Sequence, residues 1–153
     1  MQKVSFCSII YYMNSHTDYR TKPRIPTETL CTEVAGEREQ YSMIVELSEA
    51  GLRLQRPLLG RMESRIVQLE FELPEVDELV WAKGVVCFDQ LWRVPATGRT
   101  AQARVLRTSG VRVVAAATRH LRMLRDYVRA TAEARRRARP PLKRLDPLHL
   151  SWR

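Results

Sequence analysis

Cysteine is rare in this chain, and its three copies, Cys7, Cys31 and Cys87, lie far apart. No two of them form a C-x-x-C pair and their number is odd, so the sequence predicts neither a disulfide framework nor a zinc site. A reducing compartment is the simplest setting for such a chain, and we expect a cytoplasmic protein. The six glycines and eight prolines exclude collagen-like and low-complexity classes.

Histidine is equally scarce, and the three histidines fall in different parts of the chain, at His16, His120 and His149. No spacing pairs them as metal ligands or as a catalytic base beside a nucleophile. The motifs of metalloproteases, serine hydrolases, P-loop proteins and dinucleotide-binding enzymes are also missing. The sequence therefore predicts no enzyme, no catalytic residue, no metal site and no cofactor.

Long hydrophobic runs are missing as well. The longest mostly apolar stretch, residues 4–13, has about half of the ~20 residues that a membrane-spanning helix needs. No small-residue cleavage site follows it, which argues against a signal peptide. We expect no membrane span and interpret residues 1–18 as a flexible leader.

Positive charge is plentiful but concentrated at one end of the chain. There are 26 Lys and Arg residues against 17 Asp and Glu, a formal net charge of +9. Eleven of the basic residues and only three of the acidic ones lie between Arg119 and Arg153, so residues 1–118 are nearly neutral. A basic tail of this kind is usually solvated, and nucleic-acid binding through it ranks last among the functions considered.

Alternating apolar and polar residues predict an all-β domain. The clearest strand covers residues 65–73, where Val67, Leu69 and Phe71 point to one side and Gln68 and Glu70 to the other. Further strands are expected at 27–34, 40–47, 52–55 and 79–88, and a last one through 103–107 or 110–114. We expect a loop at 14–26, a mobile insertion at 89–103 and a tight turn at 108–110. Short strands at this spacing indicate a barrel or a sandwich.

The pattern changes at Thr118. Leu121, Leu124 and Val128 recur at spacings of three and four residues, which predicts an amphipathic helix that ends near Arg139. We expect its apolar face to pack on the strands. The predicted organisation is a leader at 1–18, a domain at 19–133, and the end of the helix with a basic tail at 134–153.

Two polar clusters, about twenty residues apart, suit a guanine nucleotide that carries phosphates. Arg20 and Arg24 lie four positions apart in the predicted loop, and arginine grips phosphate through two N–H groups and stacks on a purine face. Glu46 and Ser48 lie at the end of a predicted strand and offer a carboxylate and a hydroxyl to a guanine edge. Gly51 allows the following turn to pass close to a ligand.

The order of these residues resembles the motifs of the PilZ domain family, R-x-x-x-R in an N-terminal loop and [D/N]-x-S-x-x-G on a barrel. Arg20 and Arg24 match the first motif, and Ser48 and Gly51 match the second. The similarity extends over roughly residues 19–129. It implies a six-stranded PilZ-like β-barrel followed by one C-terminal amphipathic helix, to which the charge distribution adds the basic tail.

The resemblance also implies a function. PilZ domains bind cyclic di-GMP, and the expected protein is a signalling receptor that passes the signal to a protein partner in bacterial motility or surface behaviour. The ligand-binding residues that the resemblance implies are Arg20, Arg24, Glu46, Ser48 and Gly51.

Two positions depart from the family pattern. Tyr19 stands where a second basic residue is common, and Glu46 stands where the motif has Asp or Asn. Glutamate keeps the acceptor oxygens but adds a methylene, which moves the carboxylate forward. The alternative is therefore a degenerate PilZ adaptor that binds cyclic di-GMP weakly or not at all and regulates through protein contacts.

Overall fold

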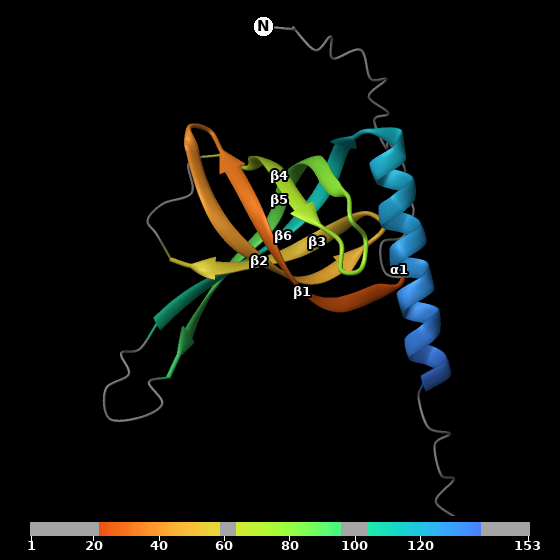
Figure 1. The fold of residues 1–153 in the computed structure, drawn as a ribbon. Coiled ribbons are helices and arrows are strands. Elements are labelled where there is room, and N and C mark those ends of the chain that lie inside the picture. Colours follow the sequence, from red (N-terminus) through yellow and green to blue (C-terminus); the bar gives the residue numbers. More distant parts are fainter. Residues whose placement is uncertain (1–21, 59–63, 96–103, 139–153) are drawn as a thin grey trace, which may run out of the picture.

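Six antiparallel strands and one helix make up the described part of a computed structural model, which covers residues 22–58, 64–95 and 104–138 (Figure 1). The leader, Arg20 and the basic tail beyond Ala138 lie outside the described residues. The elements are β1 (Arg24–Ala35), β2 (Arg38–Ser48), β3 (Gly51–Pro57), β4 (Ile66–Glu72), β5 (Leu79–Val94), β6 (Arg104–Ala116) and α1 (Thr118–Ala138).

The strands form a closed barrel in the order β1-β2-β3-β6-β5-β4. Hairpins join β1 to β2, β2 to β3 and β4 to β5, and the pairing of β1 with β4 closes the ring. The barrel with a single C-terminal helix confirms the predicted fold class.

Alternate side chains of each strand fill the barrel. In β4, Val67, Leu69 and Phe71 are buried while Gln68 and Glu72 are exposed, which confirms the predicted alternation. The same alternation in the other strands supplies the rest of the core. Its fully buried members include Ile25, Ile44, Leu47, Leu54 and Val80.

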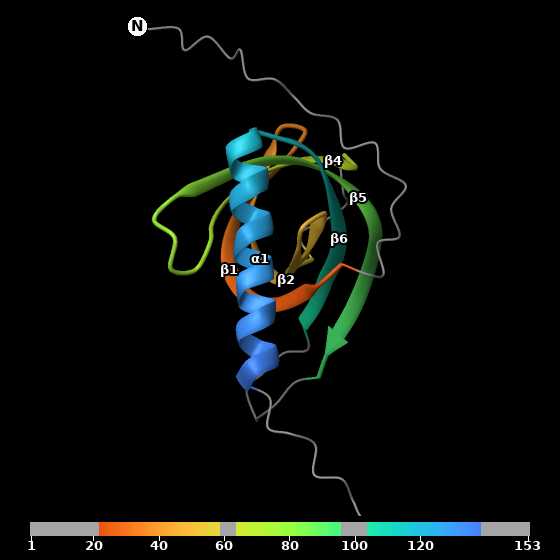
Figure 2. The ribbon, with the colours of Figure 1, turned by 90° about the vertical axis from the view of Figure 1, so that its right-hand side faces the viewer.

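Helix α1 packs its apolar stripe on this core. Leu124 and Val128 are buried within the core cluster, as the spacing predicts, and Figure 2 shows α1 in front of the ring of strands. Polar contacts also tie the helix to the barrel, because Arg129 Nε donates to Glu49 Oε1 at 2.6 Å and Arg135 Nη2 donates to the Pro26 carbonyl at 2.9 Å. The Glu49 carboxylate raises the pKa of Arg129. No helix in the described part of the chain combines the length and the apolar character needed to cross a membrane.

The first strand begins earlier than predicted. Residues 24–26, expected in a loop, are the first residues of β1, and Ile25 is 1% exposed. The register of β1 against β2 shifts between Pro26 and Thr29. A bulge is one of the few places where a sheet tolerates proline, because proline has no N–H to donate. Pro26 is thus compatible with a strand at this position.

The predictions for β5 and β6 were wrong in two respects. Residues 89–94, expected in an insertion, continue β5, and the expected turn at 108–110 is the middle of an unbroken β6. Gly110 lies opposite Phe88, and a Cβ atom there would stand 1.9 Å from the Phe88 ring. The glycine therefore makes room for an aromatic ring on the neighbouring strand. Residues 96–103 lie outside the described part.

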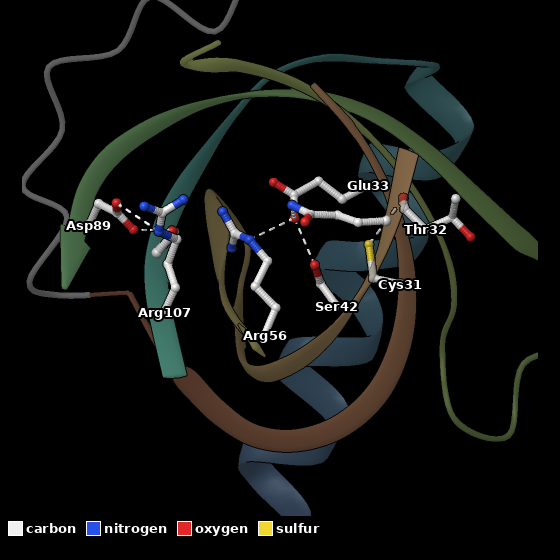
Figure 3. Close-up of polar contacts among 9 residues, drawn as sticks. Cys31, Thr32, Glu33, Ser42, Arg56, Asp89 and Arg107 are labelled. Carbon is white, nitrogen blue, oxygen red and sulfur yellow. Dashed lines mark hydrogen bonds and ion pairs between the residues drawn. The ribbon is translucent and has the colours of Figure 1, made fainter. Parts of the chain in front are cut away.

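Four charged side chains from β1, β3, β6 and β5 form a row that runs from the barrel interior to its surface (Figure 3). Buried Glu33 accepts from Arg56 Nε at 3.2 Å and from the Ser42 hydroxyl at 2.7 Å. Arg56 lies opposite Arg107 in the β3–β6 register, and Arg107 pairs with Asp89 at 3.2 Å. We call Glu33, Arg56, Arg107 and Asp89 the charged row. Each arginine has a carboxylate on its far side, which offsets the repulsion between the two.

Burial shifts the titration of two groups near the charged row. Desolvation lowers the pKa of Arg56, while the Glu33 and Asp89 carboxylates oppose that shift. Burial raises the pKa of the Cys31 thiol to about 12, so this side chain is a neutral thiol at physiological pH. The sequence analysis did not predict the charged row.

Candidate ligand-binding site

The β2–β3 hairpin holds three residues of the second motif. Ser48 and Gly51 form the last pair of the hairpin, with a two-residue turn between them. The Gly51 N–H donates to Ser48 Oγ at 3.1 Å, and the Ser48 hydroxyl donates to the Gly51 carbonyl at 2.9 Å. The serine hydroxyl thus closes the turn and keeps one lone pair to accept a further hydrogen bond.

Gly51 is needed for a close approach between strands. It lies opposite Arg112 of β6, and a Cβ atom on it would stand 2.2 Å from the Val111 carbonyl oxygen. Real Cβ atoms do not come so close to backbone oxygen, so any other residue would push β3 away from β6. The glycine therefore fixes the spacing of the two strands under the pocket.

Glu46 bridges two arginines from the strands on either side. Its Oε1 lies 3.3 Å from Arg24 Nη1, and its Oε2 lies 3.4 Å from Arg53 Nη1. The register explains the arrangement, because Glu46 lies opposite Pro26 of β1 and opposite Arg53 of β3. A register shift between Ile44 and Glu46 accompanies this alignment.

These residues line one open pocket of about 290 Å³. Four of its lining side chains are cationic and one is a carboxylate, and they come from β1, β2, β3, β6 and from Lys22, two positions before β1. The cations are Lys22, Arg24, Arg53 and Arg112, and the carboxylate is Glu46. The excess of positive charge suits an anion such as a phosphate group.

An aromatic ring forms part of the same wall. Phe88 of β5 lines the pocket and is 41% exposed, and the Arg53 guanidinium carbon lies 6.0 Å from the centroid of its ring. Such a distance is at the limit of a cation–π contact. An exposed ring beside a guanidinium offers a planar surface on which a nucleotide base can stack.

The structure brings together four of the five predicted site residues. Arg24, Glu46, Ser48 and Gly51 all line the pocket, whereas Arg20 lies outside the described residues, as does Tyr19. The pocket also contains side chains that the sequence analysis missed, namely Lys22, Arg53, Phe88 and Arg112.

Of these four residues, only Arg53 could have been assigned to the pocket from the sequence. The alternation Leu52-Arg53-Leu54 directly after the Gly51 motif places its side chain on the outer face, beside the end of the previous strand. Phe88 and Arg112 reach the pocket through the order and register of β5 and β6, which the sequence analysis did not assign. The described residues contain no group of three His, Cys, Asp or Glu side chains that could hold a metal ion.

Comparison with known proteins identifies the fold. No protein-family model and no curated protein sequence matches the chain. Among solved structures it resembles the inhibitor of motility MotI (DgrA) of Bacillus subtilis, with 16% identity and a TM-score of 0.60 over 78% of this chain and 54% of that protein. It also resembles the PilZ domain of Escherichia coli YcgR, solved with cyclic di-GMP, with 15% identity and a TM-score of 0.58 over 79% of this chain and 98% of that domain.

A third similar structure is the PlzA protein of Borreliella burgdorferi in complex with cyclic di-GMP, with 5% identity and a TM-score of 0.54 over 76% of this chain and 53% of that protein. The chain thus spans about half the length of MotI and PlzA. Together these structures confirm the PilZ-like fold that the motifs predict.

Proposed function

We propose that this chain is a receptor for cyclic di-GMP that passes the signal to a protein partner. The observation that carries the proposal is the meeting of Arg24 with Glu46, Ser48 and Gly51 on one positively charged pocket. The fold supports it as well, because two of the similar structures contain cyclic di-GMP.

Each residue has a distinct part in the proposed complex. Arg24, joined by Arg20 from the preceding segment, grips a phosphate and stacks on a guanine. Glu46 and Ser48 offer acceptor oxygens to the second guanine edge, and Arg53 balances the charge of Glu46. The pocket is at the small end of the range of about 300–1,000 Å³ for ligand sites. We expect it to hold part of the dinucleotide.

The ion pair between Arg24 and Glu46 is too weak to block the site. The Arg24 side chain is 52% exposed and the Glu46 side chain 27% exposed. Ion pairs in such exposed positions contribute about 0–1 kcal/mol. Releasing Arg24 would therefore weaken binding by less than tenfold, since tenfold corresponds to about 1.4 kcal/mol.

Helix α1 is the proposed route of the signal. Arg129 pairs with Glu49, which lies in the turn between Ser48 and Gly51, and Arg135 donates to the Pro26 carbonyl, two residues after Arg24. The helix thus contacts the turn of the second motif and a residue two positions after the end of the first. A ligand that moves either of these segments changes the helix surface that a partner protein would read. Bacterial motility or surface behaviour is the proposed process.

The second candidate function is an adaptor that works without the ligand. Glu46 favours this function, because its carboxylate already forms ion pairs with both Arg24 and Arg53. In that case the two arginines contribute to the surface of the barrel, and regulation depends on protein contacts alone.

Isothermal titration of cyclic di-GMP into the full chain tests the proposal. We expect binding in the wild type, and a loss of roughly ten- to a hundredfold in Arg24→Ala, because a hydrogen bond to a charged group contributes about 1.5–3 kcal/mol. Arg122→Ala, which removes an exposed arginine of α1, is the matched control and should bind like the wild type. Equal affinity in the wild type and in Arg24→Ala would contradict the proposed site.

The variant Glu46→Asp separates the two candidate functions. Aspartate is one methylene shorter and restores the family residue, so it loosens the bridge between Arg24 and Arg53. A wild type that binds, with Glu46→Asp equal or tighter by less than tenfold, supports the receptor. A wild type that gives no heat, with binding gained in Glu46→Asp, supports the adaptor.

A further inference from the structure

The outer half of β5 has a free edge. β4 pairs with β5 only as far as Val85, and the last hydrogen bond on that side runs from the Val86 N–H to the Arg65 carbonyl. Beyond this point β5 pairs with β6 alone, from Phe88 opposite Gly110 to Val94 opposite Arg104. In Figure 1 these paired ends, green and teal, project beyond the other strands. We call residues 87–94 of β5 the free edge, since no described strand pairs with their second side.

The free edge has little of the usual protection against pairing with another chain. A register shift between Val86 and Phe88 marks its start, and its charged residues are Asp89 and Arg93. Soluble proteins protect exposed strands with lysine, proline, bulges or short length. The free edge contains no lysine or proline, and Pro95 comes only after its end. Four of its apolar side chains are exposed, Phe88 at 41%, Leu91 at 56%, Trp92 at 56% and Val94 at 40%. An unpaired, apolar edge of this length is a template for a further strand.

We propose that the free edge of β5 pairs with the same edge of a second copy of this chain, antiparallel and centred on Leu91. Two identical antiparallel strands are related by a twofold axis. A residue that precedes the central residue by a given number of positions therefore lies opposite the residue of the copy that follows it by the same number. With Leu91 on the axis, Asp89 lies opposite Arg93 of the copy, and Phe88 lies opposite Val94 of the copy. Opposite charges and apolar pairs at these positions stabilise antiparallel strands.

Charge complementarity selects this register. The free edge has one acidic residue, Asp89, and one basic residue, Arg93, and they are equally far from Leu91. Centring on Gln90 instead would put Asp89 opposite Leu91, and centring on Trp92 would put Arg93 opposite Leu91. Only the Leu91 register pairs both charges in both copies.

The surroundings of the two charged residues fit this arrangement. The Asp89 side chain is 29% exposed while it holds Arg107 and Ser109, so its carboxylate is open to a further donor. Arg93 is exposed and has no ion pair with any described residue. A second copy accounts for the free edge more fully than an unrelated peptide, because the twofold pairing covers both edges and leaves none for growth into a fibre.

Leu91 provides a sharp test because it would lie opposite Leu91 of the second copy. In Leu91→Lys or Leu91→Glu, two like charges meet on the axis, which destabilises the pair. A mixture of the two variants puts lysine opposite glutamate and restores an attractive contact. The readout is the molar mass of the full chain without nucleotide, measured by size-exclusion chromatography with light scattering across the micromolar range. This readout is independent of cyclic di-GMP binding.

We expect the wild type to approach twice 17.8 kDa, each single variant to fall to 17.8 kDa, and the mixture to return toward twice that mass. Unchanged far-ultraviolet circular dichroism shows that the variants fold. A wild type at 17.8 kDa throughout, or a dimer that survives Leu91→Lys, would overturn the proposal. A mixture that stays monomeric would overturn the Leu91 register.

Discussion

Individual residues decide how closely the strands approach beneath the pocket. The Val111 carbonyl oxygen lies where a Cβ atom of residue 51 would stand. The Phe88 ring lies where a Cβ atom of residue 110 would stand. The spacing of the second motif is therefore tied to packing as much as to a ligand. The chain offers no room for even a methyl group at these two positions.

The variant Gly51→Ala tests this packing role. Its Cβ would meet backbone oxygen, which cannot rotate away, so we expect overpacking to lower the free energy of unfolding by about 1–3 kcal/mol. The urea midpoint measures the change. Gln68→Ala, at an exposed position of β4, should stay within about 0.5 kcal/mol of the wild type. A urea midpoint of Gly51→Ala equal to that of the wild type would contradict this account, because it would show that β6 moves away from β3 without loss of stability.

The buried ion pair of the charged row is a second feature at the scale of single residues. Glu33 and Arg56 have side chains 1% and 2% exposed, and Arg56 Nη1 has no hydrogen-bond partner among the described residues. Removal of one charge would leave the other in the interior without compensation.

We therefore expect Glu33→Gln to lower the free energy of unfolding by about 3–5 kcal/mol, measured by denaturant titration. Replacing both partners, as in Glu33→Leu with Arg56→Met, should cost less than the single change because no buried charge is left over. The exposed Glu72→Gln serves as the control. A double variant less stable than Glu33→Gln would contradict this account.

At the scale of elements, α1 is held to the barrel by a narrow apolar stripe. Leu124 and Val128 enter the core, while most other positions of the helix are exposed or half-buried. Helices in proteins gain most of their stability from tertiary packing, which here means the contact of this stripe with the core.

Leu124→Ala should consequently lower the free energy of unfolding by about 2–5 kcal/mol, the usual cost of removing a buried leucine side chain. The exposed Arg122→Ala should change it by no more than about 0.5 kcal/mol. Chemical denaturation followed by circular dichroism distinguishes them. Similar losses in the two variants would mean that α1 is held by its charges.

At the scale of the whole molecule, α1 contacts the barrel next to the residues that line the pocket. The Arg129–Glu49 pair joins the helix to the turn of the second motif, and the Glu49 side chain is only 10% exposed. In the proposed receptor, a change at the hairpin would reach the helix through this pair, whose Arg129 side chain is 61% exposed.

Hydrogen exchange with and without cyclic di-GMP tests this connection. In the wild type we expect the ligand to slow exchange in the β2–β3 hairpin and to alter exchange in α1. In Arg129→Ala the effect on the hairpin should persist while the effect on α1 shrinks, and Arg122→Ala should behave like the wild type. An unchanged response of α1 in Arg129→Ala would show that the signal takes another route.

The sequence alone was sufficient wherever structure depends on local pattern. Alternation over residues 65–73 predicted β4 and its buried face, and the three-and-four spacing from Leu121 predicted α1. The resemblance of the motif residues to the PilZ family predicted the fold, and Ser48 and Gly51, which are close in the chain, close one hairpin. These features need no knowledge of distant partners.

The tertiary structure decided the features that depend on strand order and register. Arg53 meets Glu46, Phe88 meets Gly110, and Arg56 meets Arg107 only because particular residues of different strands lie opposite one another. A shift of one residue would turn each side chain to the other face, and alternation within a single strand does not define its partner. Ser109 and Gly110 suggested a turn because the sequence does not show which residue lies opposite them. They lie in the middle of β6, where the ring of Phe88 on β5 occupies the space beside Gly110.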